Sequence, residues 1–223
     1  MTAQEKIEEA HFFLRKLREN SNKIPDAYYY YSAFLNASLS ILDHLMHDYA
    51  QKFNFTIPDD VRNLREKFEK EAKNTNNHDA MKFHEWWKIK KEYLTEKNEY
   101  GKIFSKKRHY NIHRDTFKPN QTMVLRQTAV KEEGIISFIP ARGRSLDDPD
   151  IQKYIESEAS KKVERVNEKL KERGEPTIKN IEKIVIMYDE GFGTFELCSA
   201  GVMYLLNIET ILKEAQKIFG TKK

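Results

Sequence analysis

One short segment of the sequence carries residue types that could cut a phosphodiester bond. Arg108 and His113 stand five positions apart in SKKRHYNIHRD, and a second histidine, His109, directly follows the arginine. Histidine exchanges protons near neutral pH, and arginine binds phosphate through two parallel hydrogen bonds. These groups could cleave RNA without a metal ion, because the reaction needs a base for the 2′-hydroxyl, an acid for the leaving oxygen and a cation for the phosphorane.

The same segment concentrates positive charge. From residue 98 to residue 118 there are six lysines and arginines against two acidic residues, which equals the net charge of +4 of the whole chain. Lys106, Lys107 and Arg114 could therefore hold an RNA backbone. Cations at the end of a helix also interact favourably with the helix dipole without any ligand, so a solvated helix terminus is the alternative.

The elements around this segment decide whether the arginine and the histidine can meet. On an ideal helix, residues five apart point about 140° away from each other, so they converge only where the helix ends or loosens. The sequence Tyr110-Asn111-Ile112 leads into Asp115 and Pro119, which favours such an end. The alternative is that Arg108 and His113 merely cap carbonyl groups of the helix terminus.

The first 118 residues have apolar residues at helical spacing. We expect helices over 2–21, over 27–53 behind Pro25, from 57–60 onward, and over 80–104 with a break near Gly101. The polar run 74–77 separates the last two. The helix over 27–46 has the widest apolar arc, which predicts that it is the most buried. Asp43 interrupts this arc, either as an interior acid that orients Arg108 or His113, or at the exposed edge of the helix.

The composition changes after residue 120, where β-branched runs predict strands near 121–130, 133–140 and 181–188. A long helix should start at 147–150 and end at Arg173-Gly174, and Thr194 should cap a final helix. The expected fold is mainly α: an antiparallel helical bundle over residues 1–119, and a small antiparallel β element inserted in the C-terminal half. Within residues 120–223, the last helix is expected to pack back onto the bundle.

The segment RHYNIH resembles the R-x4–6-H motif of the HEPN superfamily, which has a polar residue after the arginine. The stretch PDAYYYYSAFLNASLSILDHLM is similar to the long second helix of uncharacterised microbial HEPN-like proteins, and the resemblance covers roughly residues 5–118. It implies a small helical bundle, often a ribonuclease of toxin–antitoxin or defence systems. In this family the motif residues of two protomers meet at a dimer interface. Arg108 and His113 would then be the catalytic pair, with His109 as a polar adjunct.

The resemblance leaves three functions open. The first is a homodimeric endoribonuclease with RNA as substrate and an antitoxin-like protein as a possible cognate partner. The second is a non-catalytic HEPN-like module that holds RNA, a nucleotide or a protein in the same groove. The third is a structural partner in a two-gene module. DNA is not an expected substrate, because it lacks the 2′-hydroxyl group.

Other features of the sequence exclude classes of protein. A single cysteine, Cys198, rules out an intramolecular disulfide and a cysteine-based zinc site. His44, His47 and Asp48 lie near metal-ligand spacing, but no further cluster accompanies them, so neither a metal nor another cofactor is expected. No stretch approaches the 18 or so apolar residues of a membrane span. The acidic, amphipathic start lacks a signal core, which favours the cytoplasm.

Overall fold

The computed structural model describes residues 1–21, 23–57, 63–113, 120–128, 133–138, 149–177, 181–188 and 197–220. For residues 24–25, 109–113 and the three strands it describes the backbone alone. The chain forms two compact units. The first, the helical unit, comprises Met1–Leu17, Tyr29–Phe117 and Cys198–Lys223, and the second comprises Arg18–Tyr28 and Lys118–Leu197.

The chain is mainly helical, as the sequence predicted. The helical unit is built from α1 (Ala3–Glu19), α2 (Ile24–Lys52), α3 (Leu64–Asn74), α4 (His78–Glu92), the π-helix η2 (Tyr93–Lys97), α5 (Glu99–His113) and α7 (Leu197–Phe219). Every element among the described residues before position 114 is a helix. No helix in the described part of the chain has the length and apolar character needed to span a bilayer.

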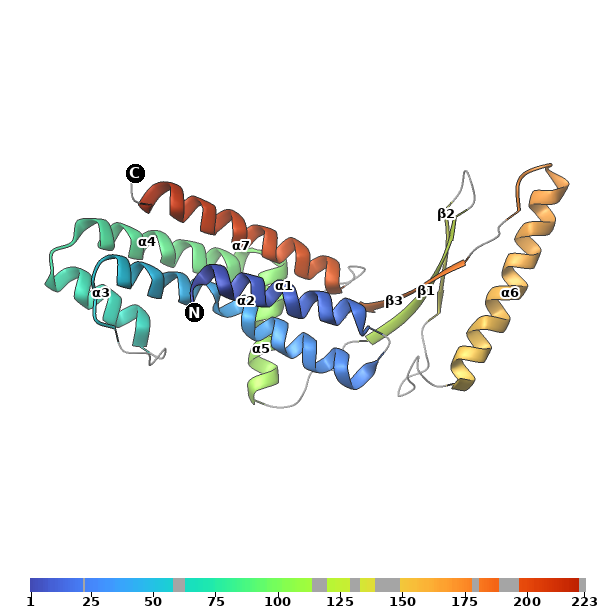
Figure 1. Cartoon of the computed structure of the whole chain (residues 1–223), viewed down its shortest axis with the longest axis horizontal. Coiled ribbons are helices and arrows are strands. Elements are labelled where there is room, and N and C mark those ends of the chain that lie inside the picture. Colours follow the sequence, from blue (N-terminus) through green and yellow to red (C-terminus); the bar gives the residue numbers. More distant parts are fainter. Residues whose placement is uncertain are drawn as a thin grey trace. The chain divides into compact units, whose positions relative to one another are not determined.

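Helix α2 forms the centre of the helical unit, which confirms the prediction from its wide apolar arc. Phe34, Leu35, Ile41 and Met46 are completely buried, although they point in several directions around the helix axis. A helix that buries side chains over so wide an arc needs neighbours on several sides. Figure 1 shows α1, α4, α5 and α7 around it.

Polar contacts join α2 to three of these neighbours. The Ala3 amide of α1 donates to Asp48 Oδ2 at 2.8 Å. The Trp87 indole of α4 donates to the Leu42 carbonyl at 2.6 Å. The Tyr49 hydroxyl donates to the Ala215 carbonyl of α7 at 2.8 Å. Each bond satisfies a polar group that the apolar core would otherwise leave unpaired.

One end of the helical unit is packed with aromatic rings. Tyr49 of α2 stacks on Phe83 of α4 with a centroid distance of 4.1 Å. The Phe219 ring of α7 meets the Phe83 ring edge-on, with 5.4 Å between their centroids. The centroid of the Phe68 ring of α3 lies 5.6 Å from that of Phe83. Aromatic pairs at such distances add stabilisation beyond the burial of their area. This cluster joins α7 to the three consecutive helices α2, α3 and α4.

The helix expected over 80–104 differs from the prediction in one respect. It breaks at Asn98, where ψ is 125°, and Gly101 lies inside the next helix. The Asn98 side chain accepts a hydrogen bond from the Gly101 amide at 2.9 Å, as a helix-capping residue does. A Cβ atom on Gly101 would overlap the Leu94 carbonyl oxygen and come within 2.9 Å of Tyr204 Cε2. Glycine is therefore required for close packing here, not as a helix breaker.

The described residues of the second unit include three strands and one long helix. Strands β1 (Asn120–Thr128), β2 (Glu133–Phe138) and β3 (Ile181–Tyr188) form an antiparallel sheet in the order β2-β1-β3. Helix α6 (Pro149–Glu172) begins with a proline, whose missing amide costs nothing in the first turn. Gly174, with φ at +67°, follows its end and allows the left-handed conformation that stops a helix.

We expect Gly101→Ala to destabilise the protein by about 1–3 kcal/mol, because the overlap with a backbone carbonyl cannot be relieved by a change of rotamer. Urea denaturation measures the effect. The neighbouring exposed substitution Lys102→Ala is the control and should change the free energy of unfolding by less than about 0.5 kcal/mol. A Gly101→Ala variant as stable as the wild type would contradict the described approach of α5 to Leu94 and Tyr204.

His84 is a buried titratable group between α3 and α4. Its ring stacks on Phe68 at 6.1 Å, and its Nε2 atom is buried without a hydrogen-bond partner. Burial lowers the pKa of His84 below its ordinary value of 6.5. Weaker effects on this pKa come from the charges of Glu69, Glu85, Arg65 and Lys88. The folded protein therefore holds this histidine in its neutral form.

This burial predicts a loss of stability in mild acid. Below about pH 6.5 the unfolded chain takes up a proton on His84 that the folded protein resists, so the free energy of unfolding falls as the pH falls through that value. Denaturation of wild type and His84→Phe at several pH values separates this effect from that of the other histidines. Below pH 6.5 we expect the free energy of unfolding of His84→Phe to rise relative to that of the wild type. An unchanged difference between pH 8 and pH 5 would refute the expectation.

Candidate functional site

Helix α5 carries both motif residues on one continuous stretch of backbone. It extends from Glu99 to His113, so the helix ends at the motif histidine, but positions 108 and 113 both have helical conformation. At 100° per residue these positions lie about 140° apart around the axis. The helix does not loosen between them, and one copy of α5 therefore does not bring the two positions onto one face.

The Arg108 side chain of α5 is half-buried. Its Nε atom is buried and has no hydrogen-bond partner. Among the described residues, no carboxylate forms an ion pair with it. A charged group with a buried, unsatisfied donor is costly, because desolvation is not repaid by any partner. Arg108 thus has an unmet need for an acceptor, as a binding residue for an anion would.

Tyr204 of α7 is a buried polar residue on which the positive charge of Arg108 acts. It is 1% exposed, and its ring meets Phe104 edge-on at a centroid distance of 5.3 Å. Burial raises the pKa of the Tyr204 hydroxyl, and the positive charge of Arg108 opposes part of this rise. Tyr204 was not among the residues predicted for the site, although its spacing from Gly201 and Ile208 places it on the buried face of the last helix.

The other residues of the predicted site are described only in part. Lys106 is exposed and Lys107 is half-buried, both on α5. The side chains of His109 and His113, and the whole of Arg114, lie outside the described residues. Their roles in proton transfer and in binding the RNA backbone remain predictions.

Asp43 pairs with a lysine of α4. Its carboxylate accepts a hydrogen bond from Lys91 Nζ, and both side chains are partly exposed. Lys91 also lies 4.7 Å from the centre of the Trp87 ring. The Asp43 side chain thus sits at the half-exposed edge of α2, with a partner other than Arg108.

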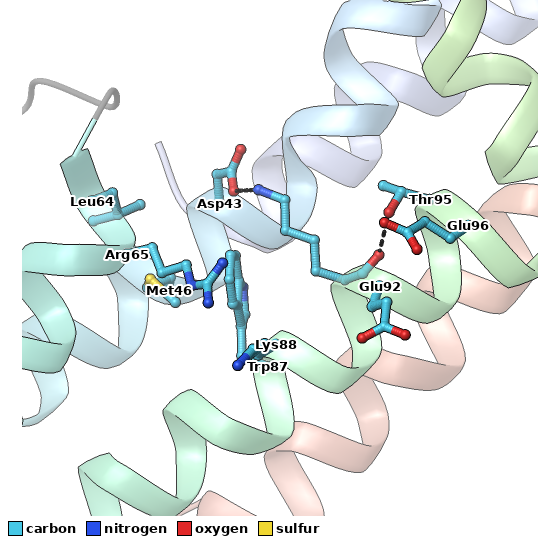
Figure 2. A pocket seen from close by; sticks show the side chains of 10 residues that line it. Asp43, Met46, Leu64, Arg65, Trp87, Lys88, Glu92, Thr95 and Glu96 are labelled. Carbon is cyan, nitrogen blue, oxygen red and sulfur yellow. Dashed lines mark hydrogen bonds and ion pairs between the residues drawn. The ribbon is translucent and has the colours of Figure 1, made fainter.

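A cavity of about 360 Å³ opens beside this ion pair (Figure 2). Trp87 and Met46 form part of its apolar lining, and Thr95 of the π-helix borders it. Its rim carries three acidic and three basic side chains: Asp43, Glu92, Glu96, Arg65, Lys88 and Lys91. Equal numbers of both signs give no net attraction for a polyanion. The cavity is therefore a poorer candidate for RNA than the surroundings of Arg108.

The histidines of α2 take part in local contacts. His44 Nδ1 lies 3.0 Å from the Met1 carbonyl oxygen, and Asp48 accepts from the Ala3 amide. Cys198 is buried in α7. Within the described ranges, no group of three histidine, cysteine or acidic side chains is arranged to hold a metal ion.

Comparison with known proteins gives this chain no relative. No family model, no curated protein and no solved structure matches it. The candidate site therefore stands on its residues and their surroundings.

Proposed function

We propose that this chain is a cytoplasmic, HEPN-like endoribonuclease that cleaves RNA without a metal ion. The observation that supports the proposal most directly is Arg108. This motif arginine has a buried Nε donor without a partner, and among the described residues no carboxylate neutralises it. A phosphate group would satisfy both the charge and the donor.

In the proposed reaction the 2′-oxygen of the RNA attacks the adjacent phosphorus, and the bond from phosphorus to the 5′-oxygen breaks. His113 carries one of the two proton transfers, from the 2′-hydroxyl or to the leaving 5′-oxygen, and solvent water carries the other, with His109 as the polar adjunct. Arg108 stabilises the negative charge of the phosphorane. Lys106, Lys107 and Arg114 hold neighbouring phosphates. The products are a 2′,3′-cyclic phosphate and a 5′-hydroxyl.

The proposed site is shared between two protomers. Positions 108 and 113 lie about 140° apart on one continuous helix, so the histidine that serves a given arginine has to come from elsewhere. A two-fold axis beside α5 would bring Arg108 of one copy to His113 of the other, twice. The antiparallel β element of the C-terminal half belongs to the proposal as an accessory, outside the catalytic pair.

We expect the purified protein to cleave single-stranded RNA in the presence of EDTA and to leave DNA intact. His113→Ala should lower the rate by about 10²–10⁴, the usual contribution of general acid–base catalysis. Arg108→Ala should lower it by about 10²–10³, through the loss of one charge-stabilising donor. Gel analysis of the products, with identification of the cyclic phosphate, measures both effects.

Lys153→Ala, a substitution of an exposed lysine on α6, is the matched control and should leave cleavage unchanged. Cleavage that survives His113→Ala would point to a contaminating nuclease. Intact RNA after long incubation with the folded protein, over a panel that includes tRNA and mRNA, would favour the non-catalytic binding module instead.

The shared site also predicts a homodimer in solution. Light scattering at micromolar concentration should give twice the mass of the chain, which is 26.5 kDa. Mixing Arg108→Ala protein with His113→Ala protein should restore part of the activity, because half of the sites in each heterodimer would hold both intact residues. A strict monomer that nevertheless cleaves RNA would rule out the shared site.

A further inference from the structure

The cavity beside the Asp43–Lys91 ion pair has the features of a small-molecule site. Its volume of about 360 Å³ lies at the lower end of the range usual for ligand pockets. The described residues that line it belong to α2, α3, α4 and the π-helix η2, all in the helical unit. Met46, Leu64 and Trp87 give it an apolar wall, and each of these side chains is otherwise buried.

Contacts within the helical unit hold this wall in place. The Trp87 indole donates to the Leu42 carbonyl at 2.6 Å, which fixes the plane of the ring. Lys91 Nζ lies 4.7 Å from the centre of that ring and pairs with the Asp43 carboxylate. The Thr95 hydroxyl donates to the Lys91 carbonyl at 2.9 Å. The cavity is therefore formed before any ligand arrives, which lowers the cost of binding.

The charged side chains of the rim are sorted by sign along α4 and η2. Lys88, Glu92 and Glu96 stand four positions apart, so they follow one another along one side of the helix, with the cation first. In Figure 2, Arg65 lies to the left of the Trp87 ring, and Glu92 and Glu96 lie to its right. The rim thus has a basic end and an acidic end.

Two cations form the basic end. The ring of Phe68 on α3 stacks on that of His84 on α4, with 6.1 Å between their centroids. Arg65 and Lys88 each lie about one turn away from this contact, in opposite directions along two helices that a short turn connects. Among the described residues, neither cation forms an ion pair.

The acidic end has one carboxylate with a partner and one without. Glu92 Oε1 lies 3.0 Å from Lys97 Nζ, and both side chains are exposed. Glu96 forms no ion pair with a described residue. Positions 88 and 92 are separated by about 6 Å along the helix axis, so the opposite charges of a ligand that contacts both ends must also lie apart.

We propose that this cavity binds a dipeptide, with its carboxylate towards Arg65 and Lys88 and its ammonium group towards Glu92 and Glu96. A free amino acid carries both charges on one carbon atom, whereas the two residues of an extended dipeptide span about 7 Å. The side chains of the dipeptide contact the apolar wall. This site does not depend on the proposed reaction with RNA.

The test uses alanyl-alanine and two modified forms of it. The N-acetyl form has no ammonium group, and the C-terminal amide has no carboxylate. Chemical-shift titration of the ¹⁵N-labelled protein measures weak binding and also locates it. We expect saturable shifts around the cavity with a dissociation constant in the millimolar range or below. Both modified forms and free alanine should bind more weakly.

Substitutions on the rim assign each end of the ligand. Lys88→Ala should weaken binding of alanyl-alanine about threefold, the effect of one exposed ion pair, but should not change binding of the amide, which lacks the carboxylate. Glu96→Gln should weaken binding of alanyl-alanine and should not change that of the N-acetyl form. Lys82→Ala on α4 and Glu66→Gln on α3 are the matched controls, because both residues are exposed and lie outside the cavity lining.

The absence of saturable shifts at about 10 mM alanyl-alanine, or shifts confined to other parts of the chain, would overturn the proposal. Equal affinity for free alanine, or equal losses in the two control variants, would overturn it as well. The outcome for the nuclease is separate, because none of these variants changes Arg108 or His113. Dipeptide binding without cleavage of RNA would remove the proposed activity and keep this site, and cleavage without dipeptide binding would do the reverse.

Discussion

The close approach of α5 to its neighbours at Gly101 decides where the candidate site lies. Without a side chain at this position, α5 can start directly beside the Leu94 carbonyl of the π-helix and against the Tyr204 ring of α7. A helix rises about 1.5 Å per residue, so the seven positions from Gly101 to Arg108 cover about 10 Å along the same face. Once Gly101 and Phe104 are packed, the place of Arg108 follows.

The charged side chains of the helical unit differ in whether they have a partner. Asp43 and Lys91 form an ion pair at the surface, and His11 of α1 lies 2.9 Å from Glu209 of α7. Pairs of this kind add little stability, but they leave no charge unsatisfied. Arg108 differs, because its buried donor has no described partner. An unsatisfied group of this kind costs about 1–3 kcal/mol, so its presence calls for an explanation other than stability.

The sequence predicted what local periodicity controls. The helices α1 and α2, the polar separation of α3 from α4 and the end of α6 at Gly174 all follow from side-chain spacing or from turn residues. The break expected near Gly101 is present, but it lies at Asn98. A glycine serves either to end a helix or to allow close packing, and only its neighbours decide which. Those neighbours include Tyr204, which is distant in sequence. Lys91, the partner of Asp43, could not be predicted either, because it is also distant in sequence.

The core of the helical unit and its proposed chemistry have different requirements. A single chain buries the apolar arc of α2 and closes the aromatic cluster around Phe83, so the core is complete in one copy. The proposed catalytic pair is not complete in one copy, because a continuous helix holds positions 108 and 113 on different sides of its axis. In the proposed enzyme, a single protomer can therefore fold, but only the dimer has a complete active site. Dissociation of the dimer would then abolish activity while leaving each helical unit folded. A partner protein that competes for the α5 surface would inhibit the enzyme in this way.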